Sequence, residues 1–161
     1  MSAKAGEGWR DDLEPIRALR PRHILFLCVA NSARSQMAEG IARALAPPGV
    51  QVSSAGSSPT RVRPQAIAAL RESGIDLSSH VAKHVSTIDP KTVDVVVTLC
   101  SDEECPLFLG KALRVHWGLP DPASATGSEE EQLAAFRQVR DELSRRLGAL
   151  FSGWRSEESK P

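Results

Sequence analysis

The sequence has no excess charge of either sign and no long apolar run. Twenty basic and twenty acidic side chains cancel, so no overall field draws the chain to nucleic acid or to an anionic membrane. The longest apolar run, residues 24–30, is far too short to span a bilayer, and the charged segment before it lacks the order of a secretory signal. We therefore expect a cytoplasmic protein without a nucleic-acid or membrane partner, in which any anion-binding site is local.

Cysteine is scarce as well, and the pattern contains neither an internal repeat nor a second domain. Three cysteines, an odd number, do not make the disulfide framework of a secreted protein, and in a reducing compartment they serve chemistry or packing. A chain of 161 residues with 41% apolar content suits one compact domain. We expect a monomer with a flexible, loosely attached extension over residues 1–20, a single domain over residues 21–155 and a tail over residues 156–161.

Apolar runs alternate with helical patterns along the rest of the chain. Strands are predicted over residues 23–30, 50–56, 93–100 and 112–117, from apolar runs bounded by polar residues or glycine. Helices are predicted over residues 32–46, 64–74 and 128–151, with a short one over residues 11–19. This alternation predicts an α/β fold, a three-layer sandwich in which a parallel sheet of about four strands carries helices on both faces.

Two cysteines fall at the carboxyl ends of predicted strands, where folds of this class bind their ligands. Cys28 lies near the carboxyl end of the first strand and Cys100 at that of the third. Five residues separate Cys28 from Arg34, and a helix follows. A strand–loop–helix junction of this kind aims successive backbone N–H groups at one point, where the helix N-terminus adds partial positive charge. The predicted oxyanion cradle consists of Val29, Ala30, Asn31, Ser32, Ala33, Arg34 and Ser35.

The residue types in this cradle fit nucleophilic chemistry at an oxyanion. Arg34 can hold two oxygens of a tetrahedral anion in a bidentate fork, and the same field favours a thiolate at Cys28, to which Ser35 could donate a hydrogen bond. A buried cysteine that merely ends a strand is the competing interpretation, and the strand–loop–helix context weighs against it. Asp121, in the Pro-rich loop after the last strand, could protonate a departing oxygen.

Four motifs extend this picture. CVANSARSQMAEG begins at Cys28, SSAG at Ser53, VVVTLCSDEECP at Val95 and HWGLPDPA at His116. In this order and spacing they resemble the arsenate reductases built on the low-molecular-weight protein tyrosine phosphatase fold, in particular the thioredoxin-coupled type. The likeness runs over residues 23–151, most of the chain.

The resemblance implies a relay of three cysteines. Cys28 attacks the arsenic of arsenate, which the loop amides and Arg34 hold, while Asp121 protonates the leaving hydroxide. Cys100 then attacks the Cys28 adduct, which releases arsenite and leaves a Cys28–Cys100 disulfide. Cys105 attacks Cys100 in turn and moves the disulfide to Cys100–Cys105, which thioredoxin or another thiol reductant reduces. The resemblance further implies no tightly bound cofactor, with phosphate and sulfate as mimics of arsenate.

Two departures from the family pattern concern the cysteines. Only four residues separate Cys100 from Cys105, fewer than in the thioredoxin-coupled type, so glutaredoxin or a small thiol stays an alternative reductant. The family loop often has a further cysteine where this sequence has Ala33, and that cysteine takes no part in the relay.

A third departure concerns a cation. Some relatives bind a monovalent cation beside the loop, and Asn31, Glu39 and Ser54 match three of its ligands, but Lys83 stands where the family has an acid. Either the Lys83 ammonium replaces the cation near Glu39, or Lys83 is a solvated surface residue. With Ser35, these four residues are the expected supports of the loop. We expect no metal site, because His80 and His84, although at helical spacing, have no cysteine or carboxylate partner at ligand spacing.

Two other functions compete with arsenate reduction. A tyrosine phosphatase would use Cys28, Arg34 and Asp121 through a phosphocysteine intermediate, but the chain has no tyrosine and has Ala123 where such enzymes often place an aromatic residue. A non-catalytic sensor that binds arsenite or an oxyanion through three thiols is the other alternative, and the sequence shows no basic recognition helix to support it.

Overall fold

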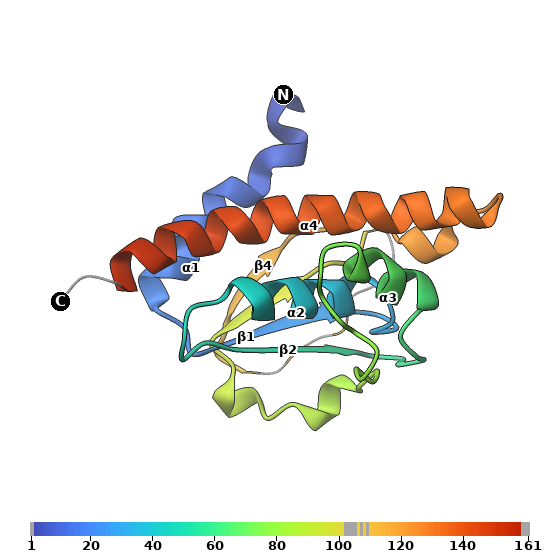
Figure 1. Ribbon diagram of the computed structural model, residues 1–161. Helices are drawn as coiled ribbons and strands as arrows, with labels where there is room; N and C mark the ends of the chain where they lie inside the picture. Colours follow the sequence, from blue (N-terminus) through green and yellow to red (C-terminus); the bar gives the residue numbers. More distant parts are fainter. Residues whose placement is uncertain (1, 102–105, 107, 109, 159–161) are drawn as a thin grey trace.

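A parallel sheet of four strands forms the centre of the molecule. The computed structural model describes residues 2–101, 106, 108 and 110–158. The strands are β1 (His23–Cys28), β2 (Gln51–Gly56), β3 (Val95–Thr98) and β4 (Leu113–His116), in the order β2-β1-β3-β4 (Figure 1). Every neighbouring pair is parallel, which confirms the predicted sheet. Strands β1 and β3 end earlier than expected, because the last apolar residues of each run belong to the loops at the carboxyl edge.

Helices and turns cover the two faces of this sheet. The α-helices are α1 (Leu13–Leu19), α2 (Arg34–Leu45), α3 (Pro64–Arg71) and α4 (Glu129–Glu158). The 3-10 segments are η1 (Ser2–Asp12), η2 (Val85–Thr87), η3 (Pro90–Thr92) and η4 (Pro122–Ser124). Helices α2, α3 and α4 lie on one side of the sheet, and η2 and η3 lie on the other (Figure 1). In the described part of the chain, no helix combines the length and the apolar character needed to cross a membrane.

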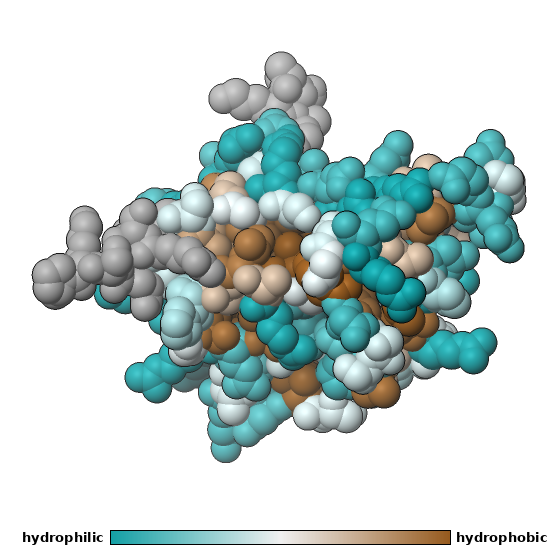
Figure 2. Space-filling model, in the orientation of Figure 1, coloured by the Kyte–Doolittle hydropathy of each residue, from teal (hydrophilic) through white to brown (hydrophobic). Residues whose placement is uncertain are grey.

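The side chains of β1 alternate between two hydrophobic clusters. Ile24 and Phe26 belong to the main core beneath the helices, whereas Leu25 and Leu27 pack with Phe108 on the opposite face. Apolar residues also gather along the line where α4 meets α2 and α3 (Figure 2). A strand that is buried on both faces needs cover on both faces. The predicted three layers are therefore present, although short 3-10 turns make up much of the second outer layer.

Helix α4 runs the length of the helical layer. Ser128 caps its start, because Glu131 N donates to Ser128 Oγ (3.1 Å) and Ser128 N donates to Glu131 Oε1 (2.8 Å). Its buried stripe contains Phe136, Val139, Leu143, Leu147 and Leu150. Phe151 and Trp154 continue this stripe, so the helix extends past its predicted end. The predicted tail over residues 156–161 therefore begins within the helix.

The N-terminal segment packs on the core, so the prediction of a loosely attached extension is wrong. Trp9, Leu13 and Ile16 are buried, with exposed fractions of 4%, 8% and 0%, and belong to the main core cluster. Two carbonyls of α4 accept hydrogen bonds from Arg17 (3.0 and 3.1 Å). The three apolar residues stand four and three positions apart, which places them on one helical face. The polar composition around them concealed this face in the sequence.

Ile16→Ala is expected to lower the free energy of unfolding by about 2–5 kcal/mol, because it removes a fully buried side chain and leaves a cavity. Leu19→Ala is the matched control on the same helix, since the Leu19 side chain is 52% exposed, and it should change stability by no more than about 0.5 kcal/mol. Urea unfolding of both variants measures the difference. Equal, small effects would show that the segment does not pack on the core in solution.

Candidate active site

A small cavity lies where the loop after β1 faces the loop after β4. Its volume is about 190 Å³, and the residues that line it are Cys28, Val29, Ala30, Ser32, Ala33, Arg34 and Asp121. The structure therefore brings the carboxylate of Asp121, which is distant in sequence, to the thiol and the guanidinium of the loop. A cavity of this size suits a small anion rather than a large organic ligand.

The loop carbonyls point away from this cavity. Each of three carbonyls accepts a hydrogen bond from the segment after β2: Val29 O from Ser58 N (2.9 Å), Ala30 O from Thr60 N (3.1 Å) and Ser32 O from Arg63 N (2.9 Å). In a trans peptide the C=O and the following N–H point in opposite directions. The amides that follow these carbonyls are therefore turned toward the cavity side, as an oxyanion cradle requires.

Arg34 is held by backbone oxygens on the far wall of the cavity. Its side chain is buried, with 4% exposed, and Nη1 donates to Leu119 O (3.1 Å) and to Leu99 O (3.4 Å). These carbonyls follow β4 and β3. The guanidinium thus joins the two strand ends to the start of α2, and its planar fork is fixed before any anion arrives.

Asp121 stands at the mouth of the cavity. Its Oδ1 accepts a hydrogen bond from Ala123 N (3.0 Å), which caps η4, and its Oδ2 lies 3.9 Å from Arg34 Nη2. The side chain is 40% exposed. One oxygen is therefore held by the loop itself, while the other faces both the guanidinium and solvent. This position suits a group that exchanges protons with a departing oxygen.

A chain of hydrogen bonds leads from Asn31 to the Cys28 sulfur. Ser35 Oγ lies 2.8 Å from Cys28 Sγ, and Asn31 Nδ2 donates to Ser35 Oγ (2.8 Å). A hydroxyl has one hydrogen, and Asn31 already supplies the hydrogen on its side of the oxygen. The Ser35 hydroxyl can therefore donate its own hydrogen to Cys28 Sγ, an arrangement that stabilises a thiolate. The sequence anticipated this contact.

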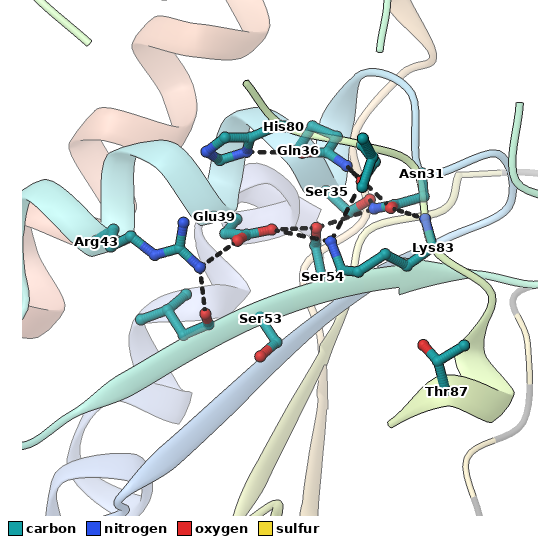
Figure 3. Close-up of polar contacts among 12 residues, drawn as sticks. Asn31, Ser35, Gln36, Glu39, Arg43, Ser53, Ser54, His80, Lys83 and Thr87 are labelled. Carbon is teal, nitrogen blue, oxygen red and sulfur yellow. Dashed lines mark hydrogen bonds and ion pairs between the residues drawn. The ribbon is translucent and has the colours of Figure 1, made fainter. Parts of the chain in front are cut away.

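Asn31 is the centre of the network behind the loop (Figure 3). Its second Nδ2 hydrogen goes to Ser54 Oγ (3.0 Å), and its Oδ1 accepts from Gln36 Nε2 (2.9 Å) and from Lys83 N (2.8 Å). Burial lowers the pKa of His80, so the neutral ring can donate from Nδ1 to Gln36 Oε1 (3.0 Å). Every polar atom of the Asn31 side chain is thus committed, which fixes the loop against β2 and α2.

Glu39 ends this network with a buried negative charge. Ser54 Oγ donates to its carboxylate, which also pairs with Arg43 one turn further along α2. Lys83 Nζ lies 3.7 Å from Glu39 Oε1 (Figure 3). Lys83 is therefore close to the carboxylate that the family pattern assigns to the cation site. Among the described residues, no group of three histidine, cysteine or acidic side chains is arranged to hold a metal ion.

The second cysteine lies at the same carboxyl edge of the sheet as the first, at the end of the neighbouring strand. Cys100 is buried just after β3, which pairs with β1, and Leu99 N donates to Leu27 O (2.9 Å). Neighbouring strands lie roughly 4.8 Å apart. Cys100 is in a disulfide, whereas Cys28 is a free thiol. The third predicted relay residue, Cys105, lies outside the described residues.

The sequence pattern of the low molecular weight phosphotyrosine protein phosphatase family matches residues 23–160. The chain belongs to this family. It is similar to an arsenate reductase of Bacillus subtilis, with 44% identity over 126 residues that cover 77% of this chain and 91% of that one.

Solved structures of the phosphatase family show the same fold. An arsenate reductase in its oxidised state matches with a TM-score of 0.70 and 32% identity, over 83% of this chain and 98% of that chain. An arsenate reductase in a phosphate-binding state matches with a TM-score of 0.69 and 32% identity, over 82% of this chain and 98% of that chain. The family match begins at residue 23, so the packed N-terminal segment lies outside it.

Sequence reasoning missed several residues that support this phosphatase-family loop. A Cβ on Gly56 would lie 2.3 Å from Val29 O, so only glycine lets β2 end this close to the loop. Gln36 and Arg43 brace Asn31 and Glu39. The spacing of Arg43, four residues after Glu39, was a usable signal. The sequence pointed to Gly56 only through its place at the end of a strand and of the SSAG motif.

Ser35→Ala is expected to slow alkylation of Cys28 by iodoacetamide about tenfold, because a hydrogen bond to a charged group contributes roughly 1.5–3 kcal/mol. Ser58→Ala is the control, since Ser58 is exposed and bonds the loop through its backbone. Peptide mass spectrometry counts modification at Cys28 alone. If both variants react at the wild-type rate, Ser35 does not stabilise the thiolate.

Proposed function

We propose that this chain reduces arsenate to arsenite with Cys28 as the nucleophile. The observation that carries the proposal is a second cysteine, Cys100, at the end of the strand beside the one that ends at Cys28. A phosphatase needs the cradle, the guanidinium and the acid but has no task for a second sulfur at this edge. The arsenate reductase relatives in the family support the same activity.

The first step joins sulfur to arsenic. The loop amides and Arg34 hold the arsenate oxygens, and Cys28 Sγ, with Ser35 as its hydrogen-bond donor, attacks the arsenic. Asp121 gives a proton to the hydroxide that leaves, so water departs. Arsenic stays pentavalent in this step.

The second step transfers two electrons. Cys100 attacks Cys28 Sγ, the sulfur–arsenic bond breaks toward arsenic, and arsenite leaves as trivalent arsenic. The two thiols lose two electrons and become a Cys28–Cys100 disulfide. Cys105 then attacks Cys100, which returns Cys28 as a free thiol.

A thiol reductant must reopen the last disulfide, and we take thioredoxin as the first candidate. Arsenate-dependent oxidation of NADPH by thioredoxin and its reductase measures the whole cycle. We expect Cys28→Ser, Cys100→Ser and Cys105→Ser each to abolish repeated turnover. Cys105→Ser should still release arsenite once, because the Cys28–Cys100 disulfide forms without it. If Cys100→Ser or Cys105→Ser turns over repeatedly, the chain does not use a three-cysteine relay.

Hydrolysis of 4-nitrophenyl phosphate in the same variants is the control. It requires Cys28 and should survive in the Cys100 and Cys105 variants, which also shows that they fold. The phosphatase alternative predicts this hydrolysis together with no turnover of arsenate. Glutaredoxin and a small thiol replace thioredoxin in parallel assays to identify the reductant class.

Lys83 is proposed to take the place of the monovalent cation that some relatives bind. Asn31 Oδ1 already accepts two hydrogen bonds, and Ser54 Oγ already bonds Asn31 and Glu39. These oxygens therefore do not fit the needs of a cation as well as those of a hydrogen-bond network. The Lys83 ammonium, 3.7 Å from Glu39, supplies the positive charge from within the chain.

Lys83→Met should lower arsenate turnover, because it removes one of the positively charged side chains that pair with Glu39. Potassium chloride should partly restore this turnover, because a potassium ion can replace the lost ammonium. Choline chloride keeps the ionic strength constant. Lys91→Met is the matched control, since Lys91 is exposed and lies on η3. Wild type and the control should not respond to potassium. An equal response in all three proteins would contradict the proposed role.

A further inference from the structure

Trp117 links the wall of the active site to the N-terminal segment. Its side chain is 1% exposed, and its indole Nε1 donates to Asp12 Oδ2 (2.9 Å). Its ring meets Trp9 edge to face, with the ring centroids 6.0 Å apart and the planes at 68°. Asp12 and Trp9 precede residue 23, where the family match begins. Both contacts therefore come from residues outside the stretch that the family pattern matches.

The backbone of Trp117 is held by hydrogen bonds to β3 and to α4. Its N–H donates to Thr98 O on β3 (2.8 Å), and its carbonyl accepts from Arg146 Nη1 on α4 (3.1 Å). These bonds fix where the residue lies in the fold. The direction of its indole depends on the N-terminal partners, since the hydrogen bond to Asp12 and the Trp9 ring both act on the side chain.

The backbone from Trp117 to Asp121 is too rigid for a displacement of Trp117 to be taken up before it reaches Asp121. A Cβ on Gly118 would lie 2.8 Å from a carbonyl that follows β3, so this backbone is in close contact with the neighbouring loop. Leu119 is bonded at both ends, because its N–H donates to that same loop (3.1 Å) and its carbonyl accepts from Arg34 (3.1 Å). Prolines flank Asp121 and restrict its backbone. A shift at Trp117 therefore moves the acid.

We propose that Asp12 and Trp9 are positioning residues for Asp121 and act through Trp117. The inference rests on the proposed role of Asp121 as the proton donor. Asp12 touches neither the cavity nor its lining, so it has no part in binding arsenate. Its effect falls on the geometry of proton transfer, where a displacement of about 1 Å can cost 10²-fold in rate.

The test compares Asp12→Ala, which removes the acceptor, with Asp12→Asn, which keeps one. Asp12→Ala should increase hydrogen–deuterium exchange in residues 117–121 and lower the single-turnover rate of arsenite formation about tenfold. Asp12→Asn should restore both, because an amide oxygen still accepts the indole hydrogen. Asp11→Ala, which removes the same charge from an exposed neighbour, should behave as wild type.

Aryl phosphates separate positioning from general loss of structure. Asp12→Ala should slow hydrolysis of phenyl phosphate more than that of 4-nitrophenyl phosphate, because the poorer leaving group depends more on the proton donor. Equal slowing of both substrates, or no rescue by Asp12→Asn, would overturn the proposal, as would wild-type behaviour of Asp12→Ala. If the wild type fails to reduce arsenate, the proposed function is wrong, and the ratio of the two phosphatase rates still decides the role of Asp12.

Discussion

The geometry of the site depends on the side-chain amide of Asn31. Its backbone has a positive φ of 50°, a conformation that asparagine tolerates better than most residues. Its side-chain amide donates two hydrogen bonds through Nδ2 and accepts two through Oδ1. These bonds fix the positions of the Ser35 hydroxyl, the end of β2 and the segment at Lys83. In a buried network the loss of one partner leaves another polar group unsatisfied. The loop therefore has one arrangement, and the hydrogen bond to the Cys28 sulfur follows from it.

The two buried charges on either side of this loop, those of Glu39 and Arg34, have different kinds of partner. Behind the loop, the Glu39 carboxylate is compensated by Arg43 and Lys83. In front of it, Arg34 is held by two backbone carbonyls, and Asp121 stands 3.9 Å away. Carbonyl dipoles fix the guanidinium without cancelling its charge. A chain with no net charge can thus hold a fixed guanidinium at the wall of a small cavity, where it can bind the oxygens of an anion.

The sequence predicted those features that depend on neighbours along the chain. Cys28, Arg34 and Ser35 fall within one loop between a strand and a helix, so their spacing was enough to place them together. The packing of Trp9 on Trp117 and the close approach of Gly56 to Val29 depend on segments that are distant in sequence. The composition of a segment does not show which distant residues it packs against. The N-terminal segment therefore looked polar and unattached, although three of its side chains are buried.

Cys28 and Asp121, the proposed nucleophile and acid, are positioned by different parts of the chain. The loop that carries Cys28 is fixed by Asn31 and its partners on α2 and β2, all inside the family match. The loop that carries Asp121 follows Trp117, whose indole contacts a segment that precedes the match. Catalysis requires both groups to converge on one oxyanion, within a tolerance smaller than the radius of an atom. Packing outside the matched residues can therefore adjust the position of Asp121 without changing the loop that carries Cys28.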